Sequence, residues 1–297
     1  MRVRIGVGVG TAAAGPAQLD AVVEGIRDAA FDSLWLSEVL TAPGFDPLAA
    51  LAYVAGRYPG TKVGATALLP GRNLVRFAKQ LATVDQLSGG RLLVVLVPGL
   101  ATGGERRSIG VPVARRGDAI DAALPALRRM LAGGPVDDGA GSDAGVDATG
   151  GVALAPLPIQ QPLDLWLGGM AAASLERCGR LADGWLPSRC TPEAAAAGRI
   201  AVEAVAERAG RVIDPEHFGV SIAYARRAPG GRAATGPGGG RGDGPAVVPV
   251  GLGALRERIL AFSEAGFSKF VVRPLDAPAS WRVELAELAE AVADLQR

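Results

Sequence analysis

The stretch RNLVRFAKQLATVDQLSGGRLLVVLV, residues 72–97, carries the clearest structural signal in the chain. Its first part places apolar side chains at steps of three and four, the spacing of one helix face: Leu74, Phe77, Leu81, Val84 and Leu87. Gly89 and Gly90 then end the helix, because the left-handed conformation of a helix end favours glycine. Residues 92–97 lack polar alternation, which predicts a strand buried on both faces in a parallel sheet. The stretch is therefore one helix–strand unit of an α/β fold.

Strand and helix patterns of this kind alternate along the whole chain. Apolar or alternating runs predict seven further strands, at residues 3–9, 33–37, 62–67, 164–167, 184–186, 218–224 and 269–273. Helical periodicity predicts further helices at residues 16–30, from 46 onward, and at 118–131, 171–181, 192–209, 252–265 and 281–295. Strands separated by helices pair in parallel through right-handed crossovers. Eight such units predict a (β/α)8 TIM barrel, and we expect residues 1–297 to form this single domain rather than two ordinary ones.

Two segments interrupt the alternation of strands and helices. Residues 133–151 are rich in glycine and aspartate, and residues 228–246 contain several glycine runs. Neither segment holds enough apolar side chains to offset the entropy of ordering it, so we expect both to be flexible, Gly-rich insertions. The second follows the seventh predicted strand, where both a lid and plain disorder remain open interpretations.

The bulk composition excludes several classes of protein. A formal net charge of +1 without a basic block gives no reason to expect nucleic acid as a partner. The longest apolar run, residues 92–100 across Pro98, is too short to span a membrane. Residues 1–9 alternate like a strand and lack the apolar length of a signal peptide. Two cysteines, Cys178 and Cys190, provide no disulfide framework, so we expect buried thiols in a cytoplasmic protein.

In a TIM barrel the functional residues follow the carboxyl ends of the strands. That rule selects Glu38, which is either a hydrogen-bond acceptor or general base, or only a solvated carboxylate. It also selects Gly168 and Gly169, where the backbone can approach a ligand closely and the amides of the next helix can bind an anion. A tight turn that needs a positive φ is the alternative explanation of these two glycines.

Other chemical templates are missing from the sequence. The only histidine, His217, stands at the start of a predicted strand, away from both cysteines, and is interpreted as structural. No nucleophile elbow, P-loop or metal-ligand spacing occurs, so we expect no metal site. The glycines of Gly6-x-Gly8-x-Gly10 lie within a strand and lack the dinucleotide-binding spacing. A barrel of this kind commonly takes its chemistry from a cofactor.

Several segments, in order, resemble the bacterial luciferase-like superfamily of flavin monooxygenases and deazaflavin (coenzyme F420)-dependent oxidoreductases, which are TIM barrels. The most specific is residues 78–91, AKQLATVDQLSGGR. Residues 31–38 resemble the family's second strand, and Gly110-Val111-Pro112 with Arg115, Arg116 and Gly117 resembles its loop after the fourth. Residues 165–169 and 181–187 resemble its fifth and sixth strands. The resemblance covers nearly the whole chain.

The resemblance implies that F420, or alternatively FMN, lies across the barrel mouth. It implies a non-prolyl cis peptide at Thr66–Ala67 against the ring, Glu38 near the ring and Gly99 beneath the cofactor. It also matches Gly168 and Gly169 to the glycines on the phosphate side. The full set of expected cofactor-binding residues is Glu38, Thr66, Ala67, Leu69, Pro98, Gly99, Gly103, Gly168, Gly169, Met170 and Ala171, with Glu38 also the one catalytic candidate.

The chain departs from the family pattern at two positions. Relatives that oxidise sugar phosphates or alcohols commonly carry a histidine where this chain has Val39, and an acid where it has Leu100. The loop after the second strand is mostly apolar, at Val39, Leu40, Ala42, Pro43 and Phe45. These residues favour a small apolar or neutral organic substrate and argue against sugar phosphates.

Three functional hypotheses follow. The first is an F420-dependent oxidoreductase that transfers hydride to or from such a substrate, with catalysis mainly by positioning. The second is an FMN-dependent, luciferase-like monooxygenase that uses reduced flavin and oxygen. The third is a barrel that binds a cofactor or a partner without turnover. By analogy with the family, we expect a homodimer.

Overall fold

The computed structural model describes residues 2–9, 15–101, 103–135, 153–227 and 247–296. Eight parallel strands lie in the order β6-β5-β4-β3-β2-β1-β8-β7. Their bounds are β1 Arg4–Gly8, β2 Ser33–Ser37, β3 Lys62–Leu68, β4 Leu92–Val97, β5 Leu165–Leu167, β6 Gly184–Trp185, β7 Gly219–Tyr224 and β8 Lys269–Pro274. The two outer strands of this order also meet, through bridges between Trp185 and Phe218 and between Ser188 and Ser221. The sheet is therefore closed, and the predicted (β/α)8 barrel is confirmed.

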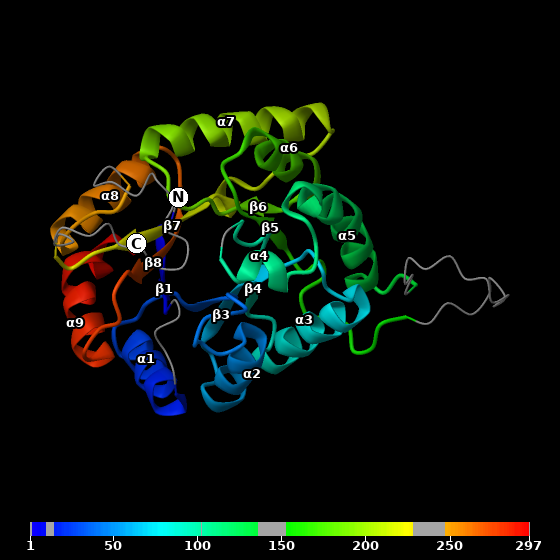
Figure 1. Ribbon diagram of the computed structural model, residues 1–297. Helices are drawn as coiled ribbons and strands as arrows, with labels where there is room; N and C mark the ends of the chain where they lie inside the picture. Colours follow the sequence, from blue (N-terminus) through cyan, green and yellow to red (C-terminus); the bar gives the residue numbers. More distant parts are fainter. Residues whose placement is uncertain (1, 10–14, 102, 136–152, 228–246, 297) are drawn as a thin grey trace, which may run out of the picture.

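Helices cover the outside of the barrel (Figure 1). Their bounds are α1 Pro16–Asp28, α2 Pro47–Arg57, α3 Leu74–Ser88, α4 Glu105–Ser108, α5 Arg116–Leu131, α6 Ala172–Leu181, α7 Pro192–Arg208, α8 Leu252–Glu264 and α9 Trp281–Val292. Short 3-10 turns add η1 Val113–Arg115, η2 Pro215–His217 and η3 Ala293–Leu295. The exception is α4, which lies within the ring of helices, over the end of β4 (Figure 1). The sequence did not predict α4, because four residues are too few to show a helical period.

The helix–strand unit at residues 72–97 forms as expected, with one difference. Asn73 caps α3 by accepting a hydrogen bond from the amide of Arg76 at 3.0 Å, and Gly89 ends the helix with a φ of 68°. Leu87, predicted on the buried face, is 51% exposed, whereas Asp85 is fully buried. The physical reason is that Asp85 accepts hydrogen bonds from the amide and the side chain of Gln160, which turns this edge of the helix inward.

Two tryptophans close the inside of the barrel. Trp35 on β2 and Trp166 on β5 are buried, and together with Val95, Leu186 and Val271 they form an apolar cluster separate from the main helix–sheet core. Glycines on neighbouring strands make room for the two indole rings. A Cβ at Gly6 would lie 2.8 Å from the Trp35 ring, and one at Gly64 or Gly184 would clash with Trp35 or Trp166. These strand glycines are therefore explained by packing.

The two Gly-rich insertions predicted at residues 133–151 and 228–246 lie almost entirely outside the described residues. Within the described part, Pro135 and Ala153 form an antiparallel bridge, so the chain leaves and returns to the barrel at neighbouring points. Among the described helices, none is both long enough and apolar enough to cross a lipid bilayer.

A first prediction concerns the packing of Trp35 against Gly64. Gly64→Ala should lower the free energy of unfolding by about 1–3 kcal/mol, because the added Cβ collides with a ring held in a closed bore. Gly56→Ala is the control, since Gly56 lies in α2 with no atom within 4 Å of the added Cβ, and should stabilise the protein by about 0.5–1 kcal/mol. Urea denaturation measures both changes. A Gly64→Ala protein as stable as the wild type would contradict the packing explanation.

Candidate active site

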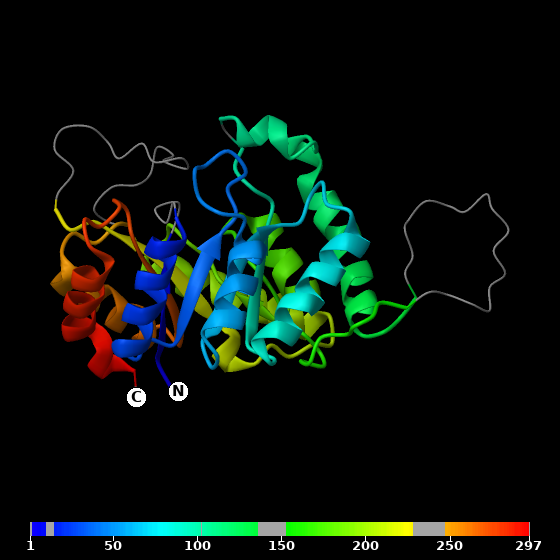
Figure 2. The ribbon, with the colours of Figure 1, turned by 90° about the horizontal axis from the view of Figure 1, so that it is seen from below.

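The carboxyl ends of the strands gather at one end of the barrel, which we call the mouth. Figure 2 shows α4 and the loop between β2 and α2 rising from this end, with both chain termini at the opposite end. Val95, Leu186 and Val271 are each at most 5% exposed and close the bore. Thr66 and Val97 are partly exposed on the bore-facing side of their strands. The mouth therefore has an apolar floor suited to a flat, apolar ring.

Glu38 stands at the end of β2, but its carboxylate is already engaged. One oxygen accepts hydrogen bonds from the Leu68 amide at 2.8 Å and from the Arg72 guanidinium at 2.5 Å. Arg72 also donates to the Leu68 carbonyl at 2.7 Å and lies over the Phe77 ring at 4.4 Å. The two side chains thus hold both backbone polar groups of Leu68, and we call Glu38, Arg72 and the Leu68 backbone the Leu68 clamp. The sequence could not reveal this use of Glu38, because Arg72 lies 34 residues farther along the chain.

The expected cofactor-binding residues in and just after β3 divide between the two faces of the sheet. Thr66 faces the bore, whereas Ala67 and Leu69 are buried in the helix–sheet core. Only the backbone atoms of Ala67 and Leu69 can therefore contact a ligand in the mouth. The cis peptide expected at Thr66–Ala67 is wrong: within the described residues the cis bonds are Ala155–Pro156 and Gln161–Pro162. Thr66 and Ala67 instead continue the regular ladder, opposite Val95 and Leu96 of β4.

The loop after β4 is held by contacts within the protein. Gly99 has a φ of 80°, and a Cβ there would lie 2.8 Å from the Leu68 side chain and 3.2 Å from a carboxyl oxygen of Glu105. The positive φ and the close packing against protein side chains, Ile109 included, explain this glycine without a ligand. Pro98 is partly exposed. Gly103 has a φ of 65°, and a Cβ there would meet no described atom within 4 Å.

Two buried charged residues near this loop were not among the site residues expected from the sequence. Arg116, at the start of α5, is 2% exposed and donates hydrogen bonds to the carbonyls of Pro98, Leu100, Arg106 and Val111. Glu105, on α4, is also 2% exposed and accepts a hydrogen bond from the Leu100 amide at 3.3 Å. The family-like motif containing Arg115 and Arg116 was the available signal, but the sequence does not say which arginine is buried.

The turn between β5 and α6 brings together the predicted glycine pair. The amide of Gly168 donates to the Leu96 carbonyl at 3.3 Å, which continues the sheet. Gly169 has a φ of 109°, and its carbonyl accepts from the indole nitrogen of Trp185 at 3.0 Å. Met170 is half-buried, Ala171 is exposed, and no side chain in the described residues caps α6. The first amides of α6 thus lack a side-chain acceptor, which suits an anion.

The loop after β2 forms an apolar wall beside the mouth. Leu40 is 47% exposed and Phe45 is 41% exposed, both high values for large apolar side chains. This wall touches the loop after β4, since a Cβ at Gly104 would lie 3.3 Å from a methyl group of Thr41. The two loops therefore meet above the same side of the barrel.

The histidine of the sequence and its two cysteines are engaged or buried. His217 precedes β7 at the opposite end, where its Nδ1 is 2.9 Å from the Asp183 carbonyl and its ring packs on Trp166. Burial raises the pKa of the Cys178 thiol to about 12 and that of the Cys190 thiol to about 11, so neither is a ready nucleophile. Among the described residues, no cluster of side chains could hold a metal ion.

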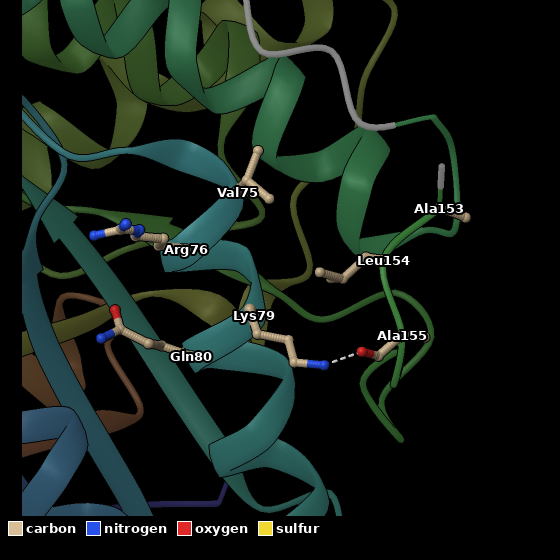
Figure 3. A pocket seen from close by; sticks show the side chains of 7 residues that line it. All are labelled: Val75, Arg76, Lys79, Gln80, Ala153, Leu154 and Ala155. Carbon is tan, nitrogen blue, oxygen red and sulfur yellow. Dashed lines mark hydrogen bonds between the residues drawn. The ribbon is translucent and has the colours of Figure 1, made fainter. Parts of the chain in front are cut away.

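A cavity of about 550 Å³ lies outside the barrel, between α3 and the segment that returns from Ala153. Val75 and Leu154 point toward it, and Lys79 donates to the Ala155 carbonyl (Figure 3). A smaller cavity of about 240 Å³ lies at the end of the barrel away from the mouth, beside Arg4 and Gln296. Neither cavity contains a predicted site residue.

A comparison with protein families agrees with this architecture. The family model described as luciferase-like monooxygenase matches residues 1–229 of the chain. The chain belongs to the luciferase-like monooxygenase family. It is an oxidoreductase of this luciferase-like family, whose members use F420 or FMN.

Several solved structures share the whole fold. The chain is similar to the coenzyme F420 dependent tetrahydromethanopterin reductase from Methanopyrus kandleri, with a TM-score of 0.77, 17% identity and 100% coverage of both chains. An F420-dependent secondary alcohol dehydrogenase, in complex with an F420–acetone adduct, matches with a TM-score of 0.75, 17% identity and 100% coverage of both chains. The oxygenating constituent of 3,6-diketocamphane monooxygenase from Pseudomonas putida, in complex with FMN, matches with a TM-score of 0.72, 18% identity and 99% coverage of both chains.

The residues at the mouth fit a phosphorylated flavin or deazaflavin. Val95, Leu186 and Val271 close the bore with apolar side chains, and the partly exposed Thr66 and Val97 lie on the same side of their strands, so a flat ring placed in the mouth meets a closed floor. The uncapped start of α6, next to Gly169, supplies backbone amide donors for a phosphate. The donor set thus suits the two chemical ends of either cofactor.

Proposed function

We propose that this luciferase-like protein is an F420-dependent oxidoreductase that transfers hydride to or from a small apolar or neutral organic substrate. The observation that carries the proposal is the engagement of Glu38, the acidic residue at the end of β2, in the Leu68 clamp. A carboxylate held by an arginine and a backbone amide is poorly suited to act as a general base. The redox chemistry then belongs to the cofactor, and the protein positions the reactants.

The proposed cofactor position uses the two features of the mouth that suit it. The cofactor would supply hydride transfer when bound. Thr66 and the backbone of Pro98 and Gly99 would hold its ring side. The amides at the start of α6, with Gly168, Gly169, Met170 and Ala171, would hold its phosphate side. This arrangement needs no residue outside the mouth.

The substrate class follows from the wall of the mouth. Val39, Leu40 and Phe45 present apolar surface on the loop after β2, and Leu100 follows β4 where some relatives carry an acid. A polar or charged substrate would lose hydration against this wall without gaining a partner. Small ketones, secondary alcohols or other neutral molecules suit it best, and the acetone adduct of the similar alcohol dehydrogenase belongs to this class.

One alternative is supported by a specific observation. The family model is described as a monooxygenase, and the similar oxygenating constituent from Pseudomonas putida binds FMN. An FMN-dependent monooxygenase is therefore the second candidate, and a barrel that binds a cofactor without turnover is the third. The proposal also includes a homodimer in the cytoplasm, for which two unpaired, buried thiols are suitable.

Cofactor choice is tested by the melting temperature of the protein with each cofactor. Reduced or oxidised F420 at about 100 times its Kd should stabilise the native state by about 2.7 kcal/mol, because only the folded protein binds it. FMN at the same concentration should raise the melting temperature less. A larger shift with FMN would favour the monooxygenase, and no shift with either cofactor would favour the barrel without turnover.

The phosphate position is tested by Gly169→Val. A side chain at a φ of 109° strains the turn, and its Cβ would lie 3.0 Å from the Ser174 hydroxyl, so the amides of α6 should no longer reach the phosphate. We expect the Kd of F420, measured by fluorescence titration, to rise about 100-fold or more. This change corresponds to the loss of two charge-assisted hydrogen bonds. Gly253→Ala, at the start of α8 with open space around it, should bind as the wild type does. A folded Gly169→Val protein with unchanged affinity would remove the phosphate from this turn.

A further inference from the structure

Leu100 is held from both sides by buried charges. Its amide donates to Glu105 at 3.3 Å, and its carbonyl accepts from Arg116 at 2.7 Å. The same arrangement occurs one strand away in the Leu68 clamp. There a carboxylate accepts a hydrogen bond from the amide of one leucine, and an arginine donates to the carbonyl of the same leucine. We call Glu105, Arg116 and the Leu100 backbone the Leu100 clamp. The two clamps lie near each other at Gly99, since a Cβ there would lie 2.8 Å from the Leu68 side chain and 3.2 Å from a carboxyl oxygen of Glu105.

The Leu100 clamp is a costly way to make a protein stable. In the Leu68 clamp the acid and the arginine form a direct ion pair, but the described contacts of Arg116 are four neutral carbonyls. The second carboxyl oxygen of Glu105 is buried and has no hydrogen-bond partner among the described residues. Burying charged groups without a direct partner opposes folding, and unpaired buried polar atoms call for an explanation. A purpose other than stability is therefore needed.

The position of the segment whose carbonyls accept from Arg116 indicates this other role. The four carbonyls span residues 98–111, which include Gly99, Gly103, Gly104 and Gly110 and would otherwise have high conformational freedom. Residues 98–100 follow β4 directly and lie between the rim of β3 and the rim of β5, because β4 pairs with both strands. Their position therefore sets the space between the apolar floor and the start of α6.

We infer that Arg116 and Glu105 are positioning residues for the cofactor: the Leu100 clamp fixes the rim of β4 before the ligand arrives. This inference rests on the proposed function, since it needs a ligand in the mouth. Preorganisation removes the entropy of ordering a loop from the cost of binding. Loss of the clamp should therefore weaken cofactor binding even where the barrel stays folded.

The test measures the Kd of F420 and of FMN alongside the melting temperature of each variant. Arg116→Met removes all four carbonyl contacts, and we expect Kd to rise about tenfold or more at a temperature well below its melting point, as for the loss of about 1.4 kcal/mol. Arg116→Lys, which can reach only some of the carbonyls, should lie between Arg116→Met and the wild type. Arg115→Met is the matched control. The Arg115 side chain is next to Arg116 in the sequence but is exposed, and among the described residues its ion pair is with Asp118. This control should bind as the wild type does.

Substitutions of Glu105 separate positioning from direct contact with the ligand. Glu105→Gln keeps an oxygen that accepts from the Leu100 amide and should bind nearly as the wild type does, whereas Glu105→Leu should weaken binding as Arg116→Met does. Equal losses in both Glu105 variants would overturn positioning through the backbone. A folded Arg116→Met or Arg116→Lys protein that binds both cofactors with an unchanged Kd would also overturn it. Failure of the wild type to bind either cofactor would instead refute the proposed function.

Discussion

The fold and the site depend on the packing of two indole rings against glycines inside the barrel. Trp35 and Trp166 need the side-chain space that Gly6, Gly64 and Gly184 leave open, and in return they close the bore. Val95, Leu186 and Val271 join the two rings in one buried apolar cluster and form a floor near the carboxyl ends of the strands. The position of this floor is thus a consequence of packing inside the sheet.

The rim above this floor is fixed by charges rather than by apolar contacts. The Leu68 and Leu100 clamps use buried acids and arginines to hold backbone groups of two successive strand ends. Apolar side chains could not do this, because a loop amide or carbonyl left without a partner costs about 1–3 kcal/mol when buried. Charged side chains that would be expected to react are therefore part of the scaffold. The apolar wall and the backbone amides of α6 are among the surfaces that the mouth offers to ligands.

Much of the fold could be predicted from the sequence, because its signals are local. The apolar spacing at residues 72–97 and its repetition along the chain were sufficient to predict the barrel, and each described strand lies where it was expected within a few residues. The errors arise where contacts between residues far apart in the sequence determine the local structure. Leu87 is exposed because Gln160 draws Asp85 inward, and the Thr66–Ala67 bond is not cis, within a stretch of β3 that pairs regularly with β4.

The candidate site was less predictable for the same physical reason. Position after a strand end correctly indicated that Glu38 lies at the mouth, but its bond to Arg72 depends on the tertiary fold. The glycine pair at residues 168–169 was visible because a tight strand-to-helix turn is a local feature. Arg115 and Arg116 are adjacent and chemically identical, so only the fold distinguishes the exposed side chain from the buried one. Sequence reasoning therefore finds elements and turns more readily than clamps.

The most direct test of this account is a crystal structure of the protein grown with F420. We expect the deazaflavin ring over Val95, Leu186 and Val271, with its phosphate at the amides that begin α6. F420 bound instead in the cavity beside α3, or a mouth that remains empty in crystals where the cofactor binds elsewhere, would contradict the account.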